Sequence, residues 1–234
     1  MKNHILIAFS FLISFQVFCQ NEIEEKRNLR FPVWITHSKN TDIIGLSLGA
    51  FPKEVLKNDT TLTRTFGIRL EASLLAVLSP LMGISPISTN DDRYEYIQQI
   101  EPTEIIYGLN LSSGTFGTTK VHGCSSALLI QYLQNMNGIS LVGMSNIIEK
   151  QNGFSASFLG NEIYKGNGIL VGFGNGATYF NGLQLGGVNG IERKGIGLQI
   201  GVFNSAKDFR GIQLGLWNEN DKRSFPIINW QFKG

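Results

Sequence analysis

The sequence predicts an all-β protein built as an array of short repeated strands, of the β-solenoid type. Glycine is abundant, at 27 of 234 residues, and only 16% of the residues are charged. This composition is typical of many short strands joined by tight turns and disfavours a helical bundle. In addition, glycine and asparagine recur at a regular spacing through the C-terminal half, and apolar and polar residues alternate between them.

Six repeat units occupy residues 137–218, with opening glycines 14 or 15 residues apart. One unit would bury three or four aliphatic side chains, worth roughly 1.5–3 kcal/mol each. Ordering the backbone costs roughly 1–2 kcal/mol for each residue, so the units must stack on one another to be stable. The opening glycines are Gly138, Gly153, Gly168, Gly182, Gly197 and Gly211, and the closing asparagines are Asn146, Asn161, Asn175, Asn189, Asn204 and Asn218.

Each unit has the period-two pattern of a β-strand. In the fifth unit Leu198 and Ile200 fall on one face and Gln199 falls on the other. The closing asparagine suits a turn because it tolerates the left-handed conformation and can bond its own backbone. An apolar residue follows two positions later in five units, and we expect it to enter a core. These residues are Ile148, Ile163, Ala177, Ile191 and Ala206.

Two architectures satisfy this pattern. In a β-solenoid each unit is one coil, the aliphatic face points inward, and the asparagines stack at a corner. In an antiparallel outer-membrane β-barrel each unit is one strand, the aliphatic face meets lipid, and Gly and Gln line the lumen. The nearly equal connectors favour the solenoid, whereas the export signal, the Gly-rich second face and the aromatic-rich last strand favour the barrel.

The N-terminal residues are typical of a secretory signal peptide covering residues 1–19. Lys2 precedes an apolar run over residues 5–13 that is shorter than the roughly 20 residues of a membrane span. We expect cleavage after Cys19, with lipid modification of Cys19 as the alternative, which the bulky Phe18 disfavours. After cleavage Cys124 remains as a single cysteine, so the fold must be held by packing and hydrogen bonds.

The pattern is weaker between the signal peptide and the regular array. Residues 20–40 form a lead segment, and residues 41–136 carry fainter copies of the motif, beginning at glycines 45, 67 and 108. One insert, residues 86–104, is polar and acidic, and we expect an exposed excursion with a short helical turn. Residues 219–234 break the repeat and predict a terminal cap or last strand.

A catalytic site is not well supported. Residues 45–49 match the nucleophile elbow of serine hydrolases at Ser47, with Asp59 and His122 as the conceivable acid and base. The same residues repeat the strand motif of the array, so a plain strand explains them. We therefore predict no enzymatic activity and keep a serine hydrolase as a distant alternative.

The sequence also gives no convincing metal, cofactor or nucleic-acid site. His37, His122 and Cys124 do not provide the three or four spaced ligands that a metal site needs. Asp91 and Asp92 lack the ligand spacing and glycine of a calcium loop, so a solvated loop is the simpler interpretation. A net charge of +2 does not favour nucleic acid.

The repeat motif resembles that of exported bacterial surface-repeat proteins. The resemblance is carried by the Gly-aliphatic-Gln-aliphatic-Gly-x-x-Asn units and by the ending from Lys222 to Trp230. It is close over residues 138–232 and looser from about residue 45. It implies a cell-envelope location and no known activity, because such families are largely uncharacterised.

Aromatic residues recur near the predicted strand ends. They could form a binding stripe or a membrane-interface belt, with ordinary core and cap packing as the alternative. The sequence thus favours a non-enzymatic envelope protein, a structural or interaction scaffold presenting a repeat β surface to the outer membrane or to other envelope components. A small outer-membrane barrel or pore is the alternative. The candidate stripe residues are Tyr164, Tyr179, Phe180, Phe209 and Trp217.

Overall fold

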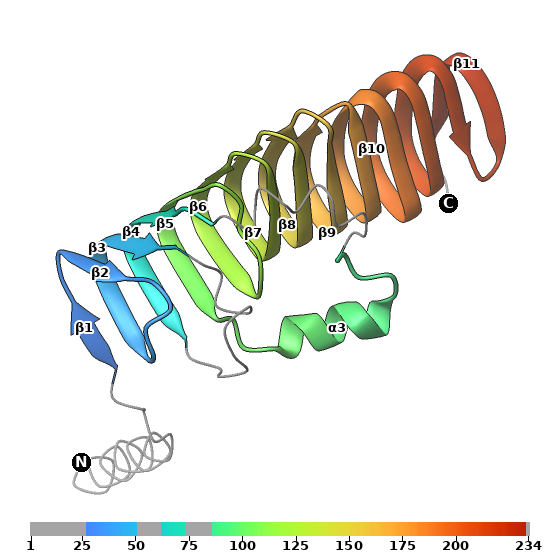
Figure 1. Cartoon of the computed structure of the whole chain (residues 1–234). Helices are drawn as coiled ribbons and strands as arrows, with labels where there is room; N and C mark the ends of the chain where they lie inside the picture. Colours follow the sequence, from blue (N-terminus) through green and yellow to red (C-terminus); the bar gives the residue numbers. More distant parts are fainter. Residues whose placement is uncertain (1–26, 51–61, 74–85, 233–234) are drawn as a thin grey trace, which may run out of the picture.

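The computed structural model describes residues 27–50, 62–73 and 86–232. The predicted signal peptide, Cys19 and Asp59 lie outside the described residues. Within them the chain winds into a β-solenoid of about nine turns along one axis (Figure 1). The solenoid predicted from the repeats is therefore confirmed.

Neighbouring coils are joined by parallel strand pairs from β3 to β10. Antiparallel pairing is found, among the described residues, between β10 and the last strand, β11 (Arg223–Gln231). The alternative of an antiparallel barrel is therefore wrong, because consecutive repeat units are consecutive coils and not hairpin-connected strands. The parallel strands are β3 (Thr41–Gly49), β4 (Thr63–Glu71), β5 (Glu104–Ser112), β6 (Thr119–Ala127), β7 (Ile130–Val142), β8 (Ser145–Ser157), β9 (Gly160–Val171) and β10 (Gly174–Asn220).

The two ends of the stack are formed by short or irregular elements. At the N-terminal end β1 (Asn28–Arg30) and β2 (Val33–Ile35) both pair in parallel with β3. At the other end β10 runs without interruption through the last coils and turns back into β11. The predicted terminal strand over residues 219–234 corresponds to β11.

A column of glycines marks the same corner of every coil. Gly168 has φ 129°, and a Cβ atom placed on it would lie 1.9 Å from the carbonyl oxygen of Gly153 in the preceding coil. Only glycine fits this corner, because an L side chain would adopt a strained φ and would collide with backbone. The column crosses the irregular half without a break and includes Gly45, Gly67, Gly108, Gly123, Gly138, Gly153, Gly168, Gly182, Gly197 and Gly211.

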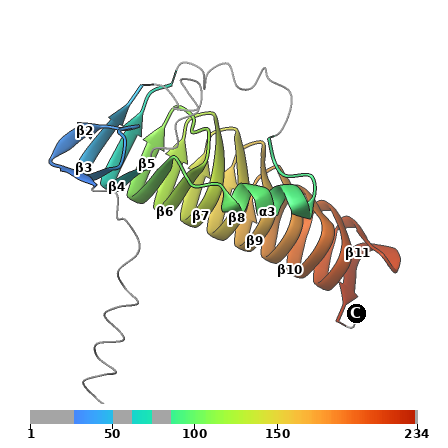
Figure 2. The same cartoon turned by 90° about the horizontal axis from the view of Figure 1, so that it is seen from below.

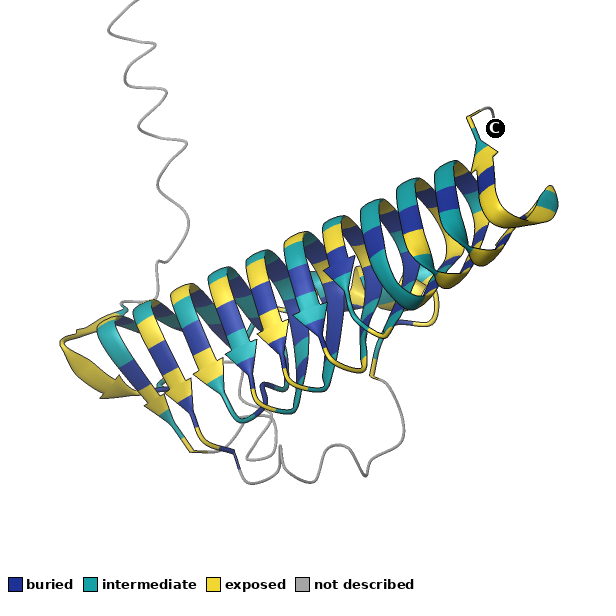
Figure 3. Ribbon diagram, turned by 90° about the horizontal axis from the view of Figure 1, so that it is seen from above, coloured by how far each residue is buried: buried dark blue, intermediate teal, exposed yellow. Residues whose placement is uncertain are grey.

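The strand that follows each glycine is oriented opposite to our expectation. Gln199 is 1% exposed and points inward, whereas Ile200 is 39% exposed and points to solvent. Burial alternates along the strands as predicted (Figure 3). The aliphatic face, however, is the outer one. The inward column is polar except at Leu170 and consists of Ser47, Arg69, Asn110, Ser125, Ser140, Ser155, Gln184, Gln199 and Gln213.

The apolar core lies on the other side of each coil, after the closing asparagine. The apolar residues predicted there are buried: Ile148 is fully inaccessible and Ile191 is 4% exposed. Phe180 and Phe209, which follow Ala177 and Ala206 in the same units, are buried in the same core. In the repeat units the interior is thus polar along the strand that follows the glycine and mainly apolar on the side that follows the closing asparagine.

The polar insert forms a helix, α3 (Asp91–Gln99), that is held against the solenoid. Its N-cap residue Asn90 accepts a hydrogen bond from the Arg93 backbone at 2.8 Å, as the capping rule requires. In Figures 1 and 2 the helix lies alongside the coils that contain β8 and β9. The predicted helical turn is confirmed, although its inner side is docked on protein. Among the described residues, no helix is long and apolar enough to span a membrane.

Candidate interaction surface

Ser47 and His122, the two described residues of the conceivable hydrolase site, do not come together. Ser47 is fully buried in the interior of β3, whereas His122 points outward from β6 and stacks on Tyr107 with 5.1 Å between the rings. Residues 45–49 form a plain strand paired with β4, not a strand-to-helix turn. A nucleophile and its base need hydrogen-bond contact, and Ser47 and His122 lie on opposite faces of the sheet.

A buried charge cluster at the N-terminal end uses one of the two histidines considered as metal ligands. The guanidinium of Arg69 lies 2.6 Å from a carboxylate oxygen of Glu71 and 2.6 Å from one of Glu104. His37 lies 3.2 Å from Glu104 and 3.7 Å from Glu71. Two cations and two carboxylates therefore balance one another inside the first coils, provided that His37 is protonated.

The pKa values of this cluster agree with that charge state. Burial opposes the charge of His37, but hydrogen bonds and attraction from Glu104 and Glu71 outweigh it and raise the pKa of His37 to about 9. Burial alone would likewise raise the pKa of Glu104, but Arg69 and His37 lower it to about 2. Because Arg69 occupies the space between the carboxylates, the cluster is an ion-pair network. Among the described residues, no group of three or more His, Cys, Asp or Glu side chains is arranged to hold a metal ion.

Sequence reasoning missed this cluster, although a signal for it exists. Arg69 stands two residues after Gly67, at the position that Gln199 occupies after Gly197. Once the fainter copies are aligned on their glycines, Arg69 falls in the inward column and must find buried partners. The two carboxylates, however, come from different coils, and their proximity depends on the stacking register.

The tyrosines of the candidate stripe anchor α3. Tyr164 donates to one oxygen of Asp91 at 2.7 Å, and Tyr179 donates to the other at 3.1 Å. Arg193 lies 2.6 Å from the same carboxylate, and Tyr94 stacks on Tyr164 at 4.8 Å. The hydrogen bond from Tyr164 is the main reason why the pKa of Asp91 lies below its usual value. Asp91 therefore anchors the helix to the coils, and the expectation of a solvated loop at this position is wrong.

The five stripe residues lie in three different places. Tyr164 and Tyr179 lie under the N-terminus of α3, whereas Phe180 and Phe209 are each 1% exposed within the core. Trp217 is 47% exposed near the C-terminal end of the stack. They do not share one surface.

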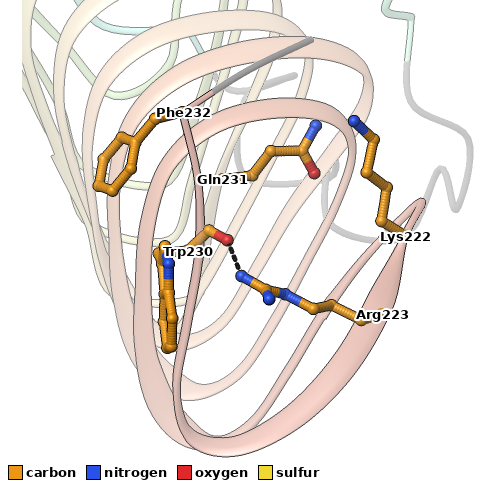
Figure 4. A pocket seen from close by; sticks show the side chains of 5 residues that line it. All are labelled: Lys222, Arg223, Trp230, Gln231 and Phe232. Carbon is orange, nitrogen blue, oxygen red and sulfur yellow. Dashed lines mark hydrogen bonds between the residues drawn. The ribbon is translucent and has the colours of Figure 1, made fainter.

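A pocket of about 400 Å³ lies at the C-terminal hairpin, lined by Lys222, Arg223, Trp230, Gln231 and Phe232 (Figure 4). Arg223 donates to Asn229 at 3.0 Å and to the Trp230 carbonyl. Its guanidinium also lies 4.7 Å from the Trp230 ring centre. Both partners belong to β11, so these contacts tie the beginning of that strand to its end, and Arg223 has a structural role that accounts for its position.

The described residues also form an extended apolar surface, the outer aliphatic face of the sheet that follows the glycine column. It consists of two columns of outward side chains, which run from β3 to β10 and include no charged residue. Ile139 and Leu141, near its middle, are 45% and 49% exposed. The first column is Leu46, Ile68, Leu109, Cys124, Ile139, Phe154, Ile169, Leu183, Leu198 and Ile212, and the second is Leu48, Leu70, Leu111, Ser126, Leu141, Ala156, Val171, Leu185, Ile200 and Leu214.

One border of the outer aliphatic face is a column of stacked rings followed by a ladder of amides. Phe66, Tyr107 and His122 stack with 5.0 and 5.1 Å between ring centres. Four asparagines then hydrogen-bond from coil to coil at 2.9 to 3.0 Å. They are Asn137, Asn152, Asn167 and Asn181. These polar side chains satisfy one another, so the border adds little charge to the face.

The chemistry of the molecule is thus concentrated in contacts that hold the solenoid together, while the outer aliphatic face is left to solvent. No family model, curated protein or solved structure matches this chain. A function must therefore be argued from the residues themselves and from the surface they form.

Proposed function

We propose that this protein is a non-enzymatic interaction scaffold of the cell envelope that binds through its outer aliphatic face. The observation that carries the proposal is the continuity of that face, which extends over ten stacked strand segments without a charged residue. Soluble proteins rarely expose contiguous apolar surface of more than a few hundred Å² unless it is used for binding.

The parallel sheet supports the same conclusion. Parallel sheets are normally covered on both faces, because their strands present apolar side chains on both sides. In this protein one face of the sheet is covered by the polar interior of the coil, and the other carries aliphatic side chains that are half-buried or exposed, with Leu141 the most exposed of them at 49%. A covering layer supplied by a partner would complete the arrangement.

The envelope location rests on the signal peptide predicted over residues 1–19 and on the resemblance of the repeats to exported surface-repeat proteins. Fractionation of the producing cells tests it directly. The protein should be recovered with the envelope and should lose the predicted N-terminal segment. Recovery of the uncut chain from the cytoplasm would contradict this part of the proposal.

Binding through the outer aliphatic face is tested by photo-crosslinking in the producing cells. A photoreactive amino acid replaces Ile139, in the middle of the face, or Lys207, which is exposed on the side that follows a closing asparagine. We expect crosslinked adducts from position 139 and none from position 207. Equal yields at both positions, or no adduct at 139, would show that the face is not a binding surface.

A further inference from the structure

We propose that the occupant of the outer aliphatic face is a second copy of this chain, packed face to face about a two-fold axis lying in the interface. This inference rests on the proposed function, because it identifies the partner of the same surface. It is carried by the size, the shape and the charge of the face.

The size of the face matches that of a stable dimer interface. Ten glycines in one column define ten stacked strands, and at about 4.8 Å per strand the face is roughly 48 Å long. Two outward columns with their side-chain radii are about 14 Å wide. Two copies would together bury on the order of 1,300 Å², within the range of specific interfaces, about 1,200–2,000 Å².

The shape of the face allows contact along its whole length. The coils stack in a nearly straight line in Figures 1 and 2, and the register between neighbouring strands is constant from β3 to β6. A strongly twisted sheet would meet its copy near one point and diverge from it elsewhere. A straight face can pack on its copy at the usual distance of about 10 Å between sheets.

The charge distribution removes the usual obstacle to self-association. In a two-fold dimer each patch meets the same patch of its copy, so any charge on it would tend to face a like charge. Neither column contains Lys, Arg, Asp or Glu, and the polar members are Cys124 and Ser126. The residues that immediately precede the column glycines border the face on one side. Among them Arg210, at the C-terminal end, is the one Lys, Arg, Asp or Glu residue. The face is therefore complementary to itself.

Sedimentation equilibrium of the purified full chain tests the inference. We expect a dimer at micromolar concentration, and at least about 100-fold weaker association for the double variant Ile139→Lys/Ile169→Lys, since like charges across an interface are strongly unfavourable. Both side chains point to solvent, at 45% and 37% exposure, so the solenoid interior is untouched. The matched control is Tyr96→Lys, which places a cation at a residue of α3 that is 66% exposed, and which should remain a dimer. All three proteins keep the same N-terminal segment. A difference in association between them is therefore caused by the substitutions in the outer aliphatic face.

Cys124 gives a second readout within the face. It is a free, exposed thiol in the first column, and its alkylation can be followed by mass spectrometry of its peptide. Alkylation should be slow in the wild-type protein at high concentration and fast in the double variant. Equal alkylation rates in the two proteins would contradict burial of the face in a dimer.

The outcomes separate the inference from the proposed function. The wild-type protein could be a monomer that crosslinks through position 139 to another molecule, or that floats with lipid vesicles of neutral or anionic composition. Either result would contradict the proposal that a second copy occupies the face, but the face would remain a binding surface. A monomer without crosslinks would overturn both. A dimer that the double variant does not weaken would place the interface elsewhere and overturn the inference.

Discussion

The side-chain amide of Asn189 lies 2.8 Å from the side-chain oxygen of Asn204, its counterpart in the next coil. The same amide also donates to the Ile200 carbonyl at 3.0 Å, and the side-chain oxygen of Asn189 accepts from Asn175 at 2.9 Å. Asn189 is therefore fully buried with its hydrogen-bonding groups satisfied. Gln199 and Gln184 repeat the arrangement at 2.6 Å, which explains how a polar column can fill the interior.

Replacing Asn189 by Ala should lower the free energy of unfolding by about 2–4 kcal/mol, because it leaves the Asn175 amide and the Ile200 carbonyl buried without these partners. Denaturant unfolding measures the change. The matched control is Asn167→Ala in the exposed ladder, where water replaces the lost contacts and the loss should be below about 0.5 kcal/mol. Equal losses at the two sites would show that the buried ladder is not important for stability.

The glycine column should be intolerant of any side chain. Gly168→Ala would place a Cβ atom 1.9 Å from the Gly153 carbonyl oxygen at φ 129°, so we expect a loss of at least about 3 kcal/mol or failure to fold. Gly176 lies in the next coil, where a Cβ atom would have no neighbour within 4 Å. Gly176→Ala should be neutral or stabilising by up to about 1 kcal/mol. Thermal melting of both variants decides the matter, and a stable Gly168→Ala protein would contradict the role of the column.

Much of the fold could be predicted from spacing and alternation. The repeated glycines, the apolar residues after each asparagine and the helix in residues 86–104 occur where the sequence placed them. The orientation of the strand that follows the glycine could not be obtained in this way, because alternation defines two faces without saying which is inside. The general preference for apolar interiors predicts the wrong face at Leu198 and Gln199.

The prediction was wrong because it left out hydrogen bonds between equivalent side chains of stacked coils. A buried glutamine is costly in isolation, but Gln199 accepts from Gln213 at 2.7 Å because equivalent residues of stacked coils are adjacent. The clue in the sequence is the same amide residue at the same position in consecutive units. Because Leu198 and Ile200 were assigned to the core, the outer aliphatic face was not recognised in the sequence. Its residues were identified correctly as one face of the strand but were placed in the interior.

The buried charge cluster predicts a specific dependence of stability on pH. The pKa of His37 rises from 6.5 to about 9 on folding. The stabilisation is therefore fully present below pH 6.5 and is lost as the pH rises through about 9. We expect the denaturation midpoint to fall between pH 6.5 and pH 9.5. His37→Asn, which tolerates the positive φ of 62° at this position, should be less stable at pH 6.5 and should show a weaker fall. The matched control is His122→Asn, in the stacked-ring border and outside the buried cluster, which should keep the wild-type profile. A profile unchanged by His37→Asn would contradict the assignment.

The docking of α3 depends on the carboxylate of Asp91, which accepts hydrogen bonds from two tyrosines and an arginine. Asp91→Asn removes the charge that pairs with Arg193 and weakens the bonds from Tyr164 and Tyr179. The helix should then separate from the coils more often, and the backbone amides of residues 91–99 should exchange with deuterium faster. Asp92 is the matched control, because it is exposed in the same first turn of the helix. Asp92→Asn removes an equal charge near the helix N-terminus and should change exchange much less. Equal acceleration by both substitutions would mean that helix electrostatics, and not the contact with the tyrosines, hold α3 in place.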